Sequence, residues 1–177
     1  MMKKIVGFLC ALLLSGNVYS VDGLFVEAGS GQLTNAARAG AIWNMDRQWF
    51  TGGDWQVTGY WEASAATLQG KSSSANNQRV TDLSVTPVFR LQQKDPTSIA
   101  PYLEGAIGFH LISPTSLYAT RQLGSAFQFG DHIGIGILFG EHKQFELGYR
   151  FLHMSNGGIK RPNQGINLNL LHFVYHF

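Results

Sequence analysis

A histidine and a serine lie two residues apart near the C-terminal end of the chain, in the stretch YRFLHMSNGGIKRPNQG that runs from Tyr149 to Gly165. Residues two apart on a β-strand share one face, so His153 could take the hydroxyl proton of Ser155 and make that serine a nucleophile. Asn156 and the glycines after it offer an amide and backbone N–H groups that suit an oxyanion site. A blander interpretation is that a strand simply ends here in polar residues.

The segments that would position this pair alternate between apolar and polar residues with the period of two that is typical of β-strands. The clearest is DWQVTGYWEASA, in which Trp55, Val57 and Trp61 share one face and Gln56 and Glu62 share the other. With the weaker segments included, we expect eight strands, each about ten residues long as in tilted membrane strands. They lie at 23–31, 36–45, 54–65, 81–91, 99–111, 127–139, 143–155 and 165–177.

An even number of such strands predicts an all-β fold, an eight-stranded antiparallel transmembrane β-barrel of the outer membrane, because closure removes the edges that lipid cannot tolerate. With both termini in the periplasm, the segments near 68–79, 112–124 and 156–165 become extracellular loops. The segments near 46–53, 92–97 and 140–143 then become periplasmic turns.

A soluble barrel or sandwich with an apolar interior is the alternative to a membrane barrel. Two features favour the membrane. The apolar faces carry aromatic residues such as Trp43, Trp55 and Trp61 near segment ends, as aromatic girdles do. The polar faces carry charges of both signs, which suit a barrel interior filled by ion pairs: Glu62, Asp82, Arg90, Glu104, Glu146 and Arg150. The alternate apolar residues that end at Phe177 also resemble the assembly signal of bacterial outer-membrane barrels.

The N-terminus carries Lys3 and Lys4, then the apolar run 5–14 and small residues up to Ser20. This pattern predicts a secretory signal peptide at 1–20, with a single barrel domain at 21–177 and a destination in a Gram-negative envelope. The one cysteine, Cys10, lies in the signal, so no disulfide is expected. Without Lys3 and Lys4 the 13 basic residues fall to 11, which equals the 11 acidic residues, and this near-neutral chain indicates no nucleic-acid partner.

His153 and Ser155 share the phase of Phe145, Leu147, Tyr149 and Phe151, whereas Glu146 and Arg150 have the opposite phase. The pair is therefore expected to face lipid at the end of an outward strand. Polar groups that face hydrocarbon are costly, which makes them a functional hypothesis.

The sequence resembles the PagL family of outer-membrane lipid A 3-O-deacylases. The pattern HMSNGGIKRPNQG carries most of the resemblance, and TGYWEAS, TPVF, LEGAIG, LGSAFQFGDHIGIG and DRQWF are also similar. It covers most of the chain after the signal and is densest from Leu123 to Asn167. The resemblance implies an eight-stranded barrel with a serine esterase site on its outer wall.

Transferred by position, the resemblance makes Ser155 the nucleophile and His153 its general base. It makes Asn156 and the Gly158 N–H the oxyanion donors, and Asn163 a residue that shapes the loop or the oxyanion hole.

The third member of the triad, which orients His153, has two candidates. The best-known family pattern has a glutamate where this chain has Asn167. The Asn167 carbonyl could still accept the Nδ1–H of His153, although it cannot supply the negative charge that stabilises an imidazolium. Asp131 is a second candidate, because a turn at 140–143 would pair it with residue 152 or 153 on the same outward face. The alternative for Asp131 is an ordinary aspartate in the headgroup zone.

We therefore expect an esterase that hydrolyses the acyl ester at the 3-position of lipid A in lipopolysaccharide and releases a 3-hydroxy fatty acid. No cofactor or metal is expected, because the other histidines have no ligand spacing. The partners are the lipopolysaccharide substrate and outer-membrane lipids, and the oligomeric state is left open, a homodimer included. Lys160 and Arg161 fit either a contact with lipid A phosphates or a solvated loop.

Two other functions remain open from the sequence. A non-catalytic adhesin or structural barrel would have long polar loops, and loss of catalysis through the change at Asn167 would also lead there. A lipid A acyltransferase barrel should have its acyl site in the lumen, whereas the phase of His153 and Ser155 points outward.

Overall fold

The computed structural model describes residues 20–73, 77–96 and 99–177. The predicted signal peptide therefore lies outside the described residues except for Ser20. No helix in these ranges is long and apolar enough to cross a membrane.

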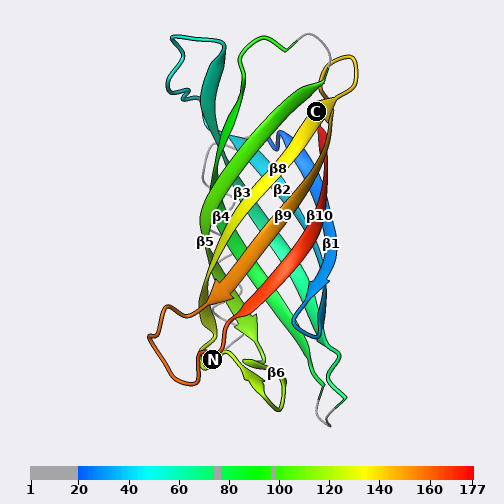
Figure 1. The fold of residues 1–177 in the computed structure, drawn as a ribbon, viewed down its shortest axis with the longest axis vertical. Helices are drawn as coiled ribbons and strands as arrows, with labels where there is room; N and C mark the ends of the chain where they lie inside the picture. The colour runs from blue at the N-terminus through cyan, green and yellow to red at the C-terminus, as the bar shows by residue number, and fades with distance from the viewer. Residues whose placement is uncertain (1–19, 74–76, 97–98) are drawn as a thin grey trace.

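Eight antiparallel strands close into the predicted barrel (Figure 1), in the order β1-β10-β9-β8-β5-β4-β3-β2. Each strand pairs with its sequence neighbours in the barrel, and β1 pairs with β10 to complete the closure. The strands are β1 (Gly23–Gly31), β2 (Thr34–Asn44), β3 (Trp55–Gly70), β4 (Arg79–Gln93), β5 (Ala100–Ser113), β8 (Phe127–Phe139), β9 (Phe145–Ser155) and β10 (Ile166–His176).

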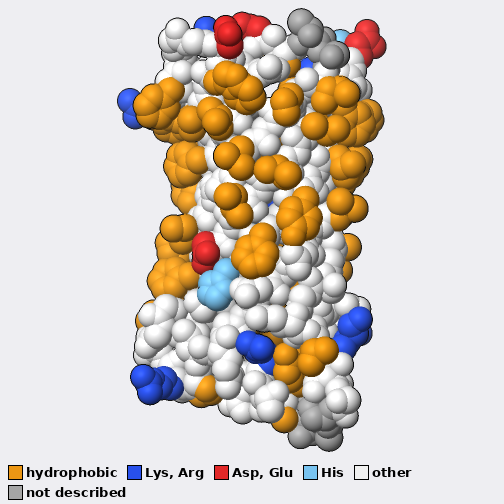
Figure 2. Space-filling model, viewed as in Figure 1, with side chains coloured by type: hydrophobic (Ala, Val, Ile, Leu, Met, Phe, Trp, Pro, Cys, Tyr) orange, Lys and Arg blue, Asp and Glu red, His pale blue; other side chains and the backbone are white. Residues whose placement is uncertain are grey.

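The outer wall of the barrel is apolar along most of its length. Side chains such as Ile107 and Ile133 point outward and are 63% and 58% exposed, while the neighbours Gly108, His132 and Gly134 on the same strands are buried. Figure 2 shows these hydrophobic side chains spread along the wall between two polar ends. A soluble barrel would bury such residues, so the wall agrees with the membrane prediction and disfavours the soluble alternative.

The lumen holds the charged residues that the sequence analysis placed on the inner faces. The Arg150 guanidinium lies within 2.8 Å of carboxylate oxygens of Glu27, Glu62 and Glu104. Arg90 bridges Glu104 and Glu146, with both nitrogen–oxygen distances at 2.7 Å. All of these side chains are buried, so the interior is a filled ion-pair network. The network also includes Glu27 and Arg38, which were not predicted from the sequence.

The two ends of the barrel differ. The start of the described residues and the C-terminus lie at one end, where the Phe177 N–H donates to the Asp22 carbonyl at 2.9 Å; we call this the terminal end. The opposite end, the loop end, carries the connections β1–β2, β3–β4, β5–β8 and β9–β10 (Figure 1).

The connection between β5 and β8, expected as a plain loop near 112–124, forms a small hairpin of β6 (Ser116–Tyr118) and β7 (Arg121–Gln122). Leu117 and Leu123 are fully buried in it. They pack with lumen residues such as Leu68, Met154 and Ile166 in one apolar cluster that fills the loop end. Burial of apolar surface over the barrel mouth is what folds this connection back, and short-range alternation does not reveal it.

Candidate active site

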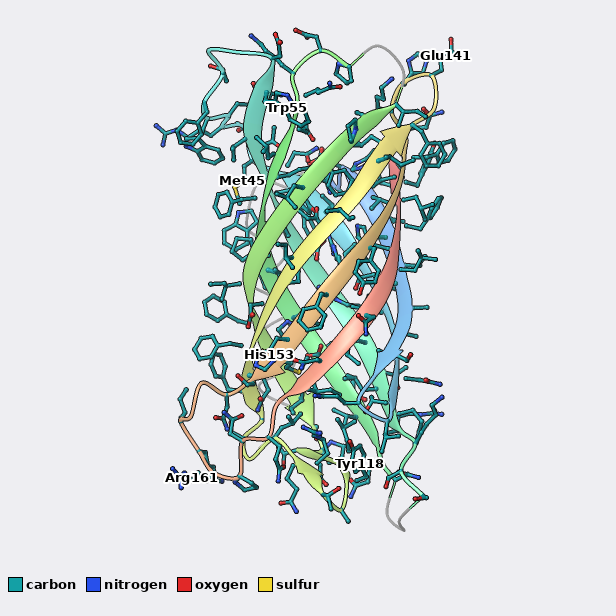
Figure 3. The ribbon with its side chains drawn as sticks, viewed as in Figure 1. Met45, Trp55, Tyr118, Glu141, His153 and Arg161 are labelled. Atoms are coloured by element: carbon teal, nitrogen blue, oxygen red, sulfur yellow. The ribbon has the colours of Figure 1, made fainter. Side chains whose placement is uncertain are left out.

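Strand β9 brings His153 and Ser155 to the outer wall at the loop end, as their phase predicted. Both side chains are half-buried. Leu152, which precedes His153, and Met154, which lies between the two, point inward and are 4% and 1% exposed. Figure 3 shows His153 close to the loop end, far from Trp55 and Glu141 at the terminal end. The pair is therefore not reached through the lumen.

Asn167 on β10 lies directly opposite His153, and its Oδ1 is 2.6 Å from Nδ1 of the imidazole. With a carbonyl oxygen as acceptor, the proton of His153 sits on Nδ1, which leaves Nε2 unprotonated toward a nucleophile. The backbone N–H of Asn167 donates to Oε1 of Gln32 at 2.8 Å. The β1–β2 turn thereby holds the residue that orients His153.

Asp131 on β8 lies opposite His153 on the other flank, which is the register that the turn at 140–143 predicted. Its side chain is exposed on the same outward face. Figure 2 shows an acidic side chain next to a histidine on this part of the wall. Asn167, His153 and Asp131 thus form a row across three strands, with the base in the middle.

Gly165 borders both candidate catalytic side chains, a role that the sequence analysis did not assign. A Cβ added at Gly165 would lie 3.1 Å from Cε1 of His153 and 3.5 Å from Cβ of Ser155. Its φ of +59° also favours glycine. No hydrogen bond joins Ser155 to His153 among the described residues. Catalytic hydrogen bonds often tighten only when substrate binds. The relevant geometry here is that the side chains of His153 and Ser155 both lie beside Gly165.

The predicted oxyanion residues form one hydrogen-bonded loop directly after Ser155. The buried Asn156 amide donates to the carbonyls of Leu123 and Lys160 at 3.0 and 2.7 Å, and its Oδ1 accepts the Gly158 N–H at 3.0 Å. The Asn156 N–H donates to Oδ1 of Asn163 at 3.0 Å. In this structure Asn156 holds the loop, and its donation to an oxyanion stays a prediction.

A second set of contacts fixes the β9–β10 loop against the β6–β7 hairpin. Nη1 of Arg121 donates to the carbonyls of Gln164 and Gly165 at 2.9 and 3.0 Å, and the Gln122 N–H donates to Oε1 of Gln164 at 2.6 Å. Tyr118, which supports Arg121, donates its hydroxyl to the Gln32 carbonyl at 2.8 Å. These residues come from three separate connections, and no local sequence pattern indicates that they meet.

The site has no metal-ligand character. Among residues 20–73, 77–96 and 99–177, no group of three or more His, Cys, Asp or Glu side chains could hold a metal ion.

A family model described as lipid A 3-O-deacylase (PagL) matches residues 35–176, a range that contains all the site residues predicted from the sequence, from Asp131 to Asn167. The chain belongs to the PagL family. Among its relatives is the lipid A deacylase PagL of Pseudomonas aeruginosa, which is 34% identical over 93% of this chain and 94% of its own length. The lipid A deacylase PagL of Bordetella bronchiseptica is 36% identical over 71% of this chain and 67% of its own.

The fold also matches a solved member of the family. The crystal structure of the outer membrane enzyme PagL superposes with a TM-score of 0.77 at 29% identity and covers 88% of this chain and 99% of the other. The predicted family and the predicted eight-stranded barrel are both confirmed.

Proposed function

We propose that this protein is an outer-membrane lipid A deacylase that works as a serine esterase on the acyl chain at the 3-position. Membership of the PagL family supports lipid A as the substrate class. The observation that carries the mechanism is the outward pair of His153 and Ser155 with Nδ1 of the histidine held by Asn167. A site on the outer wall meets a lipid ester from the side, without passage through the lumen.

The reaction proceeds through an acyl-enzyme. Oγ of Ser155 attacks the ester carbonyl while the hydroxyl proton passes to Nε2 of His153. The attack forms a tetrahedral intermediate with a negative charge on the former carbonyl oxygen. Collapse breaks the bond to the sugar 3-oxygen, and His153 returns the proton to that oxygen. A water molecule then attacks the acyl-serine, gives its proton to His153 and releases the 3-hydroxy fatty acid as Ser155 regains its hydrogen.

The oxyanion forms next to the loop at 156–158. We assign the Gly158 N–H as the oxyanion donor. When substrate binds, this N–H releases its acceptor, Oδ1 of Asn156, and donates to the substrate oxygen instead. Asn156 and Asn163 keep the backbone of this loop in position through their mutual hydrogen bond. A backbone N–H held in place by this loop stabilises the negative charge that develops on the oxygen.

An aromatic surface lies beside the nucleophile on the lipid-facing wall. Phe129 pairs with Ser155 across β8–β9, and it packs against Phe127 and Phe109 with ring centroids 5.0 and 6.2 Å apart. We assign this cluster to the substrate acyl chain, because it continues the apolar wall up to the serine. The loop end then faces the outer leaflet and the terminal end faces the periplasm.

Purified protein incubated with lipopolysaccharide tests the function. Mass spectrometry of lipid A should show the loss of one 3-hydroxyacyl chain, and Ser155→Ala and His153→Ala should each abolish that loss while the barrel stays folded. Gain of an acyl chain would indicate an acyltransferase. Unchanged lipid A with the wild-type barrel would indicate a non-catalytic protein.

A further inference from the structure

The two ends of the barrel carry opposite charge. The loop end has five cationic residues, four in its connections and one at the start of β4, and its connections contain no Asp or Glu: Lys71, Arg121, Lys160 and Arg161, with Arg79 on β4. The terminal end has five acidic residues against three basic ones: Asp22, Asp46, Asp54, Asp95 and Glu141 against Arg47, Lys94 and Lys143. In Figure 2 the basic side chains mark the loop end below the histidine, and acidic side chains mark the opposite end.

Within this cationic end, Lys160 and Arg161 stand closest in sequence to the nucleophile. They lie at the tip of the β9–β10 loop, both exposed, and Figure 3 shows Arg161 directed away from the barrel. Among the described residues neither side chain has a hydrogen bond or an ion pair. Two cations without a protein counter-charge are available to an anionic ligand.

The loop that presents them is fixed relative to the site. The Lys160 carbonyl accepts the Asn156 amide at 2.7 Å, and Arg121 holds the other end of the loop at Gln164 and Gly165. Ile159, next to Lys160, is 69% exposed. An apolar side chain beside two cations is the pattern of a segment that lies at a lipid–water interface.

We propose that Lys160 and Arg161 bind a phosphate group of the lipid A headgroup and thereby position the molecule whose ester lies at Ser155. This inference rests on the proposed function and names the substrate contact that holds the headgroup. In lipid A the phosphates and the acyl esters sit on the same sugar units. A cationic site just beyond the serine therefore meets the phosphate while the ester is at the nucleophile.

Lys71 and Arg79 serve as a matched control. Lys71 lies in the β3–β4 connection and Arg79 is the first residue of β4, and two strands separate this connection from the β9–β10 loop on either path around the barrel. The double variants Lys160→Gln/Arg161→Gln and Lys71→Gln/Arg79→Gln remove the same charge from the same end of the molecule. Only the first removes it from the side that carries the active site.

Binding is measured first, with both double variants in a Ser155→Ala background, so that the result does not depend on turnover. The titrants are micelles of phosphorylated lipid A, dephosphorylated lipid A and phosphatidylglycerol. We expect Lys160→Gln/Arg161→Gln to weaken binding of phosphorylated lipid A about tenfold and to leave dephosphorylated lipid A unchanged. The control variant Lys71→Gln/Arg79→Gln should change the affinity for each form of lipid A by less than twofold.

Kinetics with the active enzyme then separate the two proposals. The Lys160→Gln/Arg161→Gln variant should raise KM for phosphorylated lipid A about tenfold at unchanged kcat. Hydrolysis of a short neutral ester should stay at the wild-type rate. Equal losses on both forms of lipid A, an equal loss in the control pair or equal losses on phosphatidylglycerol would overturn the phosphate site. Normal phosphate-dependent binding without any ester hydrolysis would instead overturn the proposed function alone.

Discussion

Nδ1 of His153 lies 2.6 Å from Oδ1 of Asn167, across the pair of strands β9 and β10. An amide therefore occupies the place where the family pattern has a carboxylate. It can hold the imidazole in the tautomer that a general base needs, but it would bring no charge to the imidazolium of the proposed reaction. The charge in the neighbourhood comes from Asp131, which stands opposite His153 on β8.

Removal of the Asn167 amide tests the orienting role. We expect Asn167→Ala to lower kcat about 10- to 100-fold, because Nδ1 loses its acceptor and the imidazole its fixed orientation. Asn167→Glu should recover the wild-type kcat or exceed it, because a carboxylate accepts the same hydrogen and adds charge. Steady-state kinetics on lipid A measure both, and a silent Asn167→Ala would refute the orienting role.

Neutralisation of Asp131 tests whether its negative charge stabilises the His153 imidazolium. We expect Asp131→Asn to lower kcat about tenfold, which corresponds to about 1.4 kcal/mol of transition-state stabilisation. The loss should shrink in an Asn167→Glu background, because the new carboxylate then stabilises the imidazolium. A double-mutant cycle on kcat gives this coupling. Purely additive effects would show that Asp131 acts independently of His153.

A methyl group at Gly165 tests the packing around the pair. Gly165→Ala places a Cβ 3.1 Å from His153 Cε1 and strains a backbone at φ +59°, so we expect kcat to fall at least about tenfold. Gly140→Ala is the control, since Gly140 also has a positive φ but lies in the turn after β8 at the terminal end. An equal effect of both substitutions would mean that backbone strain alone is responsible.

Loss of the Arg121 contacts tests the loop clamp. We expect Arg121→Ala to lower kcat about tenfold on lipid A and on a short neutral ester alike, because the Gly165 backbone is released beside His153. Arg121→Lys should recover part of that rate by supplying one donor. Arg47→Ala, at the terminal end, controls for the loss of a cation. A defect confined to phosphorylated substrate would assign Arg121 to headgroup binding instead.

The lumen network predicts a large stability effect at Arg150. Arg150→Met leaves the Glu27, Glu62 and Glu104 carboxylates without their shared cation, which should cost about 3–5 kcal/mol of unfolding free energy. Urea unfolding in detergent micelles, followed by tryptophan fluorescence, measures it. Arg47→Met is the exposed control, and an unchanged midpoint for Arg150→Met would show that the ion pairs contribute little.

The number and order of the barrel strands, the register of β8 against β9 and the outward direction of His153 and Ser155 follow from the sequence alone, whereas β3 and β4, at 16 and 15 residues, are longer than predicted. Alternation is a local property: each strand residue points opposite to its neighbours, so a lipid-facing run sets the face of every residue in it. A short turn at 140–143 then determines which residues stand opposite each other, and it places Asp131 opposite His153.

Only the tertiary structure shows the β6–β7 hairpin, the position of Gly165 beside both candidate catalytic side chains, and the contacts made by Gln32 and Arg121. These residues belong to connections far apart in the chain, and they meet only because barrel closure brings β1, β9 and β10 together and the apolar mouth draws the hairpin over it. Asn167 illustrates both what the sequence predicts and what only the tertiary structure shows. Its phase placed it on the outer face, but only the closed β9–β10 pair put its carbonyl oxygen against the imidazole.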